Sequence, residues 1–274
     1  MFINDDFVFL HLQKAAGTFV ADRLSQRLPG TIRDGHTCLH EGKRGRIVAA
    51  AIRDPWDWYV SLWAYGCMGE GGLRGRLTSS QHQVRRRVLG DVLSGRMRPK
   101  DAIAHLRRDN DRDPAAWCDL YASAEDADRF RTWLRAILNL PAACYLPEGY
   151  PDLPMCGRVG FMTFRVLRLF TDWAAWKAGA LTVRTPDDAL AFYYRHGIVD
   201  HILKTERIAE DLERLLAKLD RSEKFEAPAA PAKSNRSRRR PHMDYYDPDT
   251  FALVQEKDRM VIEAFGYAPS ECAR

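Results

Sequence analysis

Lys14 and a run of small residues stand together near the start of the chain, in the segment FVFLHLQKAAGTFVADRL. Ala15, Ala16 and Gly17 allow an anion to approach the backbone closely, and Lys14 adds a full positive charge. From Thr18 onward the segment is expected to be helical, and the first N–H groups of a helix have no partner inside it. Because the helix dipole adds partial positive charge there, the sequence predicts a phosphate or sulfate site at this junction.

The junction is not a Walker A loop. The pattern G-x-x-x-x-G-K-[ST] is missing, and the lysine precedes the glycine. The alternative interpretation is an ordinary strand–helix turn with a solvated lysine.

Arg53 follows a second apolar run, in the segment RIVAAAIRDP. An arginine at the end of a buried strand is suited to bidentate binding of a phosphate. Ser61 lies eight residues later, inside the next expected helix, and its hydroxyl could reach the same phosphate if the helix start bends back. The alternatives are an ion pair for Arg53 and an ordinary helical serine for Ser61.

Two strand-then-helix units position these residues. The apolar runs Phe7–Leu12 and Ile47–Ile52 are each predicted to be a buried strand, and the second is followed by a helix starting at Pro55. Such units favour an α/β fold with a central, mainly parallel sheet. Ligands bind at the carboxyl ends of strands in these sheets, so Lys14 and Arg53 are expected at the same edge of the sheet.

The rest of the chain is expected to be mainly helical. Residues 67–200 carry amphipathic, strongly charged helical patterns. VDHILKTERIAEDLERLLAKL begins like a strand and continues as a helix. Residues 226–242 are rich in Pro, Ala and Arg, which predicts a mobile basic loop. One final helix is expected, with Asp247 as its N-cap and Pro248 at its first position.

Composition limits the setting and the partners. The chain has 274 residues, a formal net charge of +5 and six cysteines without C-x-x-C spacing. These features favour free thiols, no metal site and a cytoplasmic location, and no apolar stretch approaches the length of a membrane span. The mild positive charge fits an anionic small ligand as well as nucleic acid; we expect the small ligand.

Several stretches, in order along the chain, resemble the sulfotransferases that use 3′-phosphoadenosine 5′-phosphosulfate (PAPS), in particular bacterial and Golgi-type carbohydrate sulfotransferases. LHLQKAAGTF is similar to the family's 5′-phosphosulfate loop, with Gln13 where proline is usual. RDPWDWYVSLW is similar to its 3′-phosphate motif, with Trp58 where arginine is common. VDHILKTERIAEDLERLL and SNRSRRR…DYYDPDTFALVQEKDRMVIEAFGY resemble later family segments.

The resemblance implies a P-loop-like three-layer fold and roles for individual residues. Residues 14–18 would form the 5′-phosphosulfate loop, in which Lys14, Gly17 and Thr18 match the pattern K-x-x-G-T. Lys14 would contact the 5′-phosphate and the bridging oxygen of the leaving group. Arg53 and Ser61 would bind the 3′-phosphate. Residues 67–200 would shape the acceptor site.

The basic run near residue 238 has three interpretations. The first is a solvated charged tail, and the second is attraction to nucleic acid or a membrane. The third follows from the resemblance: a loop that closes over the 3′-phosphate and adenine, with Asn235, Ser237 and Arg238 as ligands.

A general base is needed for an acceptor hydroxyl, and a histidine or a tuned carboxylate is suited to that role. His36, in RDGHTCLHEG, resembles the Gly-His segment of relatives that use a histidine base. His40 and Glu41 are alternatives.

The sequence therefore predicts one α/β domain over residues 1–274 that transfers a sulfuryl group from PAPS to a hydroxyl of a carbohydrate, glycolipid or other small acceptor, leaving PAP. An ATP-dependent small-molecule kinase and a catalytically inactive nucleotide- or anion-binding protein are the alternatives. The acceptor and the oligomeric state stay open.

Overall fold

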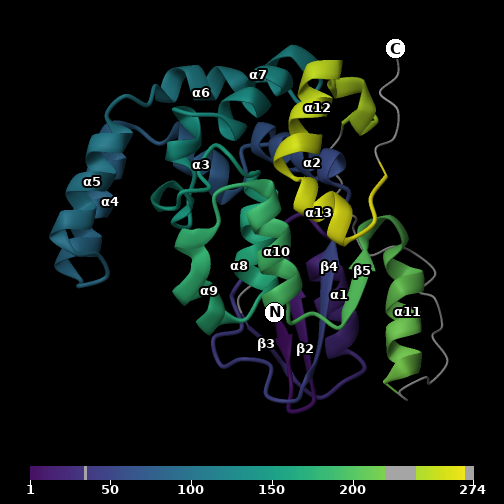
Figure 1. Ribbon diagram of the computed structural model, residues 1–274. Coiled ribbons are helices and arrows are strands. Elements are labelled where there is room, and N and C mark those ends of the chain that lie inside the picture. The colour runs from purple at the N-terminus through teal and green to yellow at the C-terminus, as the bar shows by residue number, and fades with distance from the viewer. Residues whose placement is uncertain (34–35, 220–238, 269–274) are drawn as a thin grey trace. The chain divides into compact units, whose positions relative to one another are not determined.

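The computed structural model describes residues 1–33, 36–219 and 239–268 (Figure 1). The strands are β1 (Phe2–Ile3), β2 (Phe7–His11), β3 (Thr31–Ile32), β4 (Ile47–Ile52) and β5 (His201–Lys204). The α-helices are α1 (Gly17–Ser25), α2 (Pro55–Cys67), α3 (Gly72–Thr78), α4 (Gln81–Leu93), α5 (Pro99–Asp109), α6 (Pro114–Leu120), α7 (Ala127–Leu138), α8 (Phe161–Phe170), α9 (Trp173–Gly179), α10 (Pro186–His196), α11 (Ile208–Lys218), α12 (Pro248–Lys257) and α13 (Arg259–Ala264).

The five strands form one mixed sheet in the order β3-β1-β2-β4-β5. Strands β2, β4 and β5 are parallel, with His11 opposite Ala51 and Ile52 opposite Lys204. The carboxyl ends of the three parallel strands therefore lie side by side. This agrees with the predicted α/β class and with the predicted strand at Ile47–Ile52.

The sheet is mixed rather than mainly parallel, because β1 pairs antiparallel with both β2 and β3. The side chain of Asn4 causes this reversal: its Oδ1 accepts hydrogen bonds from the backbone N–H groups of Asp6 and Phe7. Such an Asx turn folds β1 back onto β2 within three residues.

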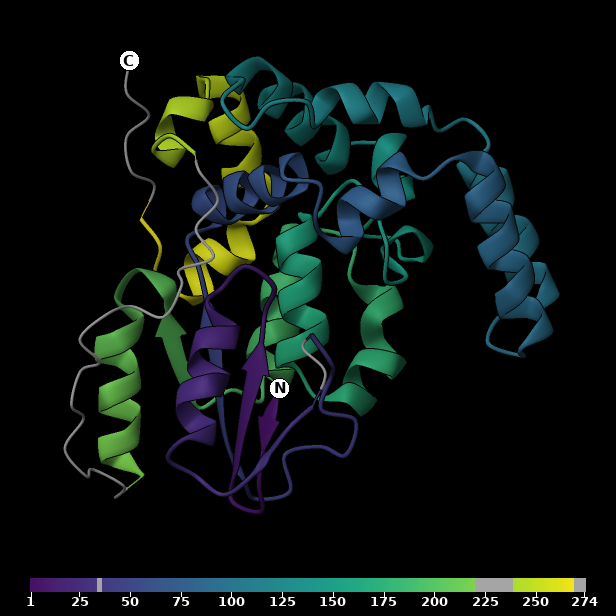
Figure 2. The same cartoon turned by 180° about the vertical axis from the view of Figure 1, so that it is seen from behind.

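The chain divides into two compact units, and neither is one continuous stretch. Among the described residues, the sheet unit comprises residues 1–33, 36–58, 159–219 and 254–268, and the helical unit comprises residues 59–158 and 239–253. In the sheet unit, α1 covers one face of the sheet, α8, α10 and α13 lie on the other, and α11 lies along β5 (Figures 1 and 2).

Aromatic side chains form the centre of the helical unit. Phe130 packs at ring-centroid distances of 5.4 Å from Trp63 and 5.5 Å from Tyr245, and Trp133 lies beside it. All four side chains are fully buried. Residues 67–200, expected to be mainly helical, contain α3 to α10.

The expected single C-terminal helix is two helices, α12 and α13, so that prediction was wrong. The break is at Asp258, whose buried carboxylate accepts 2.8 Å hydrogen bonds from the N–H and hydroxyl of Thr163. The backbone N–H of Gly160 donates to the carbonyl of Lys257. These contacts with the start of α8 replace the continuation of the helix. The predicted N-cap at the other end is present, because Thr250 N–H donates to the Asp247 carboxylate.

Candidate active site

The turn between β2 and α1 has an unusual backbone. Lys14 and Ala16 adopt left-handed conformations, with φ of 63° and 56°, which non-glycine residues rarely do. Gly17 then starts α1 under the imidazole of His11, where a Cβ would come within 1.8 Å of the ring. The turn is therefore held in one compact shape that only a glycine at position 17 permits.

No side chain in the described part of the chain caps α1 at Ala16. The first-turn N–H groups of α1 consequently have no capping side chain to donate to, as an anion site at a helix start requires. Lys14 is half-buried at this turn and Thr18 is exposed.

Arg53 links this turn to β4. Its Nη1 donates a 3.0 Å hydrogen bond to the carbonyl of Lys14. Its Nε and Nη2 both donate to one carboxylate oxygen of Asp57, at 2.7 and 2.5 Å. The arginine and the aspartate are each 16% exposed. The ion pair considered for Arg53 is thus present, and a phosphate at this position would share the guanidinium with Asp57.

The end of β5 adds a carboxylate to the same edge. Glu206 accepts a 2.7 Å hydrogen bond from the backbone N–H of Asp54, and the hydroxyl of Thr205 donates to the carbonyl of Ile52. These bonds fix the start of α2 against the end of the third parallel strand.

The two departures from the sulfotransferase pattern, Gln13 and Trp58, contact each other. The indole N–H of Trp58 donates a 2.6 Å hydrogen bond to the carbonyl of Gln13. The side-chain oxygen of Gln13 accepts from Nη1 of Arg165, an arginine of α8 that is only 3% exposed. Both residues therefore support the shape of the turn before Lys14.

Arg165 was missed by sequence reasoning. It places a buried guanidinium, another cation, beside the residue that precedes Lys14. The signal available was an arginine in the middle of the otherwise largely apolar helix FMTFRVLRLF, but nothing local indicated which residue it would contact.

His36 lies at the carboxyl end of β2. Its Nδ1 is 2.9 Å from the carbonyl oxygen of His11, and the two imidazole rings are 4.5 Å apart. A carbonyl can only accept, so Nδ1 carries the proton in this contact and Nε2 holds the lone pair. That tautomer is the one in which Nε2 can take a proton from another group.

His11 stays neutral beside it. Burial lowers the pKa of His11 to about 3, and the positive charges of His36 when it is protonated, of the N-terminus and of Arg165 act in the same direction.

The other two base candidates are engaged differently. Glu41 forms ion pairs with Arg46 at 3.0 Å and with Arg33 at 3.8 Å, and its hydrogen bond with Arg46 lowers its pKa. His40 is exposed, with its ring 4.6 Å from that of Trp173. A carboxylate held by two arginines is a weak base, so the geometry favours His36 over Glu41.

The roles expected for Ser61 and for the loop of residues 226–242 stay predictions. Ser61 is 4% exposed, lies within α2 and belongs to the helical unit. Asn235, Ser237 and Arg238, and most of the loop predicted for residues 226–242, lie outside the described residues.

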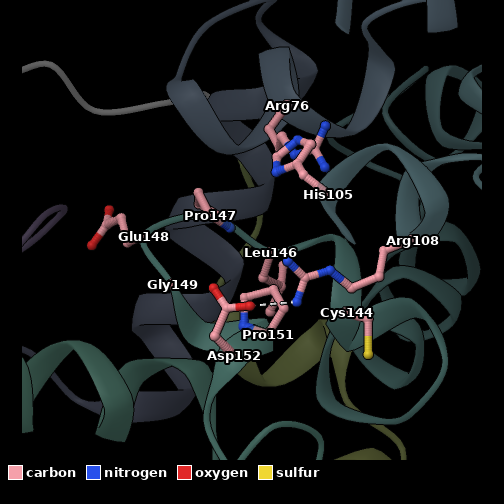
Figure 3. Close-up of a pocket in the computed structure, with 10 residues that line it drawn as sticks. All are labelled: Arg76, His105, Arg108, Cys144, Leu146, Pro147, Glu148, Gly149, Pro151 and Asp152. Atoms are coloured by element: carbon pink, nitrogen blue, oxygen red, sulfur yellow. Dashed lines mark hydrogen bonds and ion pairs between the residues drawn. The ribbon is translucent and has the colours of Figure 1, made fainter. Parts of the chain in front are cut away.

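The helical unit contains a separate pocket of about 180 Å³ (Figure 3). Figure 3 shows Arg76 and His105 on one side and Arg108 on the other, where Arg108 donates to Asp152 at 2.6 Å. Arg76 forms an ion pair with Asp109 at 2.8 Å. Both arginines of the pocket thus already contact carboxylates.

Within residues 1–33, 36–219 and 239–268, no group of His, Cys, Asp and Glu side chains is arranged to hold a metal ion, and no helix is long and apolar enough to cross a membrane. No family model, no curated protein and no solved structure matches this chain.

Proposed function

We propose that this protein is a PAPS-dependent sulfotransferase that acts on a hydroxyl of a carbohydrate, glycolipid or other small acceptor. The observation that carries the proposal is the junction at the carboxyl ends of β2 and β4. There the Lys14 turn opens an uncapped helix, and Arg53 donates to the Lys14 carbonyl. The resemblance of both segments to the PAPS-binding motifs supplies the identity of the donor.

In this proposal the charges at the junction do most of the catalytic work. Sulfuryl transfer, like phosphoryl transfer, depends on positioning and on neutralising the charge that grows on the leaving group. As the bond between sulfur and the bridging phosphate oxygen breaks, the Lys14 ammonium stabilises the negative charge left on PAP. The N–H groups at the start of α1 bind the 5′-phosphate oxygens, and Arg53 binds the 3′-phosphate.

His36 acts as the general base. The acceptor oxygen attacks sulfur as its proton passes to Nε2 of His36, the nitrogen left with a lone pair when Nδ1 donates to the His11 carbonyl. The products are a sulfate ester, PAP and a protonated His36, which then releases its proton to water.

One observation favours a second candidate, a nucleotide- or anion-binding protein without catalysis. Asp57 takes two hydrogen bonds from the guanidinium that would bind the 3′-phosphate. An arginine so neutralised is a weaker phosphate ligand.

Thermal-shift measurements with PAP, PAPS, ATP and a DNA duplex test the donor. A ligand at 100 times its Kd stabilises the folded state by about 2.7 kcal/mol, so selective binding is visible. We expect PAP and PAPS to raise Tm and ATP to have little effect, because ATP lacks a 3′-phosphate. Stabilisation by ATP with magnesium and not by PAP would instead support the kinase alternative.

Binding of PAP without turnover would support the second candidate. It would be identified by incubating the protein with PAPS and a panel of sugars and glycolipids, and searching by mass spectrometry for a product that has gained one sulfuryl group.

A further inference from the structure

Helices α4 and α5 form a helical hairpin, residues 81–109, joined by a short loop of residues 94–98. They lie side by side in both views (Figures 1 and 2). The hairpin has a small apolar core of its own, composed of Val84, Val88 and Ala102 with Val92, Met97 and Leu106 packed against it. Because the loop is short, the two helices are antiparallel.

Positive charge is concentrated in this hairpin. It contains eight Lys and Arg residues and three Asp residues, a net charge of +5 that equals the formal net charge of the whole 274-residue chain. Three of the large hydrophobic side chains that the structure exposes also lie here: Leu89 is 59% exposed, Leu93 79% and Ile103 53%.

These basic and apolar side chains share one face of the hairpin. Successive residues of an α-helix are rotated by about 100°, so residues three, four or seven apart lie on one side. On α4 this spacing joins Leu89 and Leu93 to a group of basic residues next to the core positions. On α5 it joins Ile103 to two more.

The two groups point to the same side. Seen down its own helix axis, each group is turned in the same direction away from the core positions that contact the other helix. Because the two helices run antiparallel, this common rotation places both groups on the same face of the hairpin. We call it the basic–apolar face. Its members, all exposed, are His82, Arg85, Arg86, Leu89, Leu93, Lys100, Ile103 and Arg107.

The acidic residues of the hairpin are elsewhere. Asp91 and Asp101 fall on the opposite flanks of their helices, where each pairs with an arginine of the loop, Arg96 at 3.1 Å and Arg98 at 2.7 Å. Asp109 is buried and pairs with Arg112. The basic–apolar face therefore includes none of the hairpin's own carboxylates.

We propose that the basic–apolar face docks onto an anionic lipid surface. Amphipathic helices with Lys and Arg beside exposed Leu and Ile bind membrane interfaces: the aliphatic side chains enter the boundary of the acyl chains, and the cations contact lipid phosphates. A nucleic-acid backbone would attract the same arginines, but it has no apolar surface for the three exposed aliphatic side chains to contact. The proposal does not depend on the sulfotransferase assignment.

Co-sedimentation of the full chain with vesicles tests this. We expect binding to vesicles of phosphatidylcholine mixed with phosphatidylglycerol or phosphatidylserine, and little binding to pure phosphatidylcholine. Higher salt should weaken it, because salt screens exposed charges. Equal binding to neutral and anionic vesicles, or none to either, would overturn the proposal.

Paired variants separate the face from net charge. Since one basic residue near an anionic surface is worth about a fivefold change in partitioning, R85Q/R86Q should reduce binding about 25-fold. The control R87Q/R96Q removes the same charge from other positions of the hairpin and should leave binding within a few-fold of wild type. Equal losses in the two double variants would show a nonspecific charge effect and contradict the proposal.

The apolar contribution is tested by L89Q/L93Q, with L181Q as the control at a leucine that is 62% exposed in the sheet unit. The double variant should reduce vesicle binding at least about tenfold, and the control should not. All these positions are exposed, so circular dichroism should be unchanged. Tight binding of a DNA or RNA duplex that is lost in R85Q/R86Q and kept in L89Q/L93Q would identify a nucleic-acid surface instead.

Discussion

Arg53 donates a hydrogen bond of 3.0 Å to the main-chain carbonyl of Lys14, 39 residues earlier in the chain. The bond joins the carboxyl end of β4 to the turn after β2, and Lys14 is itself in a left-handed conformation. The guanidinium thus braces the turn in addition to the phosphate-binding role proposed for it.

Replacing Arg53 should weaken PAP binding. Loss of a charged, bidentate contact costs about 1.5–3 kcal/mol, so Arg53→Ala should raise the Kd for PAP by about 10- to 150-fold in calorimetry. Arg53→Lys keeps the charge without the bidentate geometry, so its Kd for PAP should lie between those of the wild type and Arg53→Ala. Unchanged affinity in Arg53→Ala would show that the 3′-phosphate binds elsewhere.

Asp57→Asn should have the opposite effect. The carboxylate takes two hydrogen bonds from Arg53 and would compete with a phosphate for it. Removing its charge should tighten PAP binding roughly 3- to 10-fold, most clearly at low salt. Weaker binding in this variant would mean that Asp57 positions Arg53 rather than competing with the ligand.

His36→Ala should reduce turnover by roughly 10²–10⁴-fold while PAP affinity changes little, as expected when a general base is lost. Wild-type turnover should also fall on acidification, because a protonated base cannot accept a proton, and the variant should lose that dependence. His40→Ala and Glu41→Gln should remain near wild type. A large loss of turnover in either of these variants, together with near-normal turnover in His36→Ala, would assign the role of general base to His40 or Glu41 instead.

Gly17→Ala should destabilise the protein, because the new Cβ would lie 1.8 Å from the His11 ring. Forced overpacking of this kind costs roughly 1–3 kcal/mol of unfolding free energy, measured in urea. Gly90→Ala is the matched control: Gly90 is exposed in α4, and no atom of the described residues lies within 4 Å of a Cβ added there. This variant should stabilise the protein by up to about 1 kcal/mol. Adding His11→Ala to Gly17→Ala should recover part of the loss; no recovery would exclude the ring as its cause.

His11 should make the fold sensitive to mild acid. Burial lowers its folded-state pKa to about 3, whereas an unfolded chain has a histidine pKa near about 6.5. Between these values the unfolded chain binds a proton that the folded chain does not, so stability falls as pH falls. The slope is at most about 1.4 kcal/mol per pH unit. Urea unfolding at pH 7, 6 and 5 should show that the unfolding free energy of the wild type falls with pH. In His11→Asn the contribution of His11 to this slope should disappear, and equal slopes in the two proteins would contradict the prediction.

Local sequence patterns predicted the elements that carry the site. The strand Ile47–Ile52 was predicted to the residue, because an apolar run is bounded there by charged residues and a proline. The N-cap at Asp247 follows from an equally local signal, and α1 begins at Gly17, one residue before the predicted start at Thr18. These are short-range effects, which a single sequence carries.

The rest depends on contacts between distant residues. Phe2–Ile3 and Thr31–Ile32 are too short for any periodicity to mark them as strands. The break at Asp258 exists because its carboxylate meets Thr163, 95 residues away. Likewise, Arg165 contacts Gln13 only through folding, because 152 residues separate them. The pair of Asp57 and Arg53 is different: the two residues are four apart, a spacing that favours an ion pair, and the sequence offered an ion pair as the alternative for Arg53.

The two ends of the sheet have a consequence for self-association. An exposed edge strand offers unpaired backbone groups to which another chain can add, the usual start of edge-to-edge aggregation. Here one edge is β3, which has only two residues, and α11 packs against β5 at the other. Neither edge offers a long template, so the sheet is poorly suited to extension by β-strand addition, even at high protein concentration.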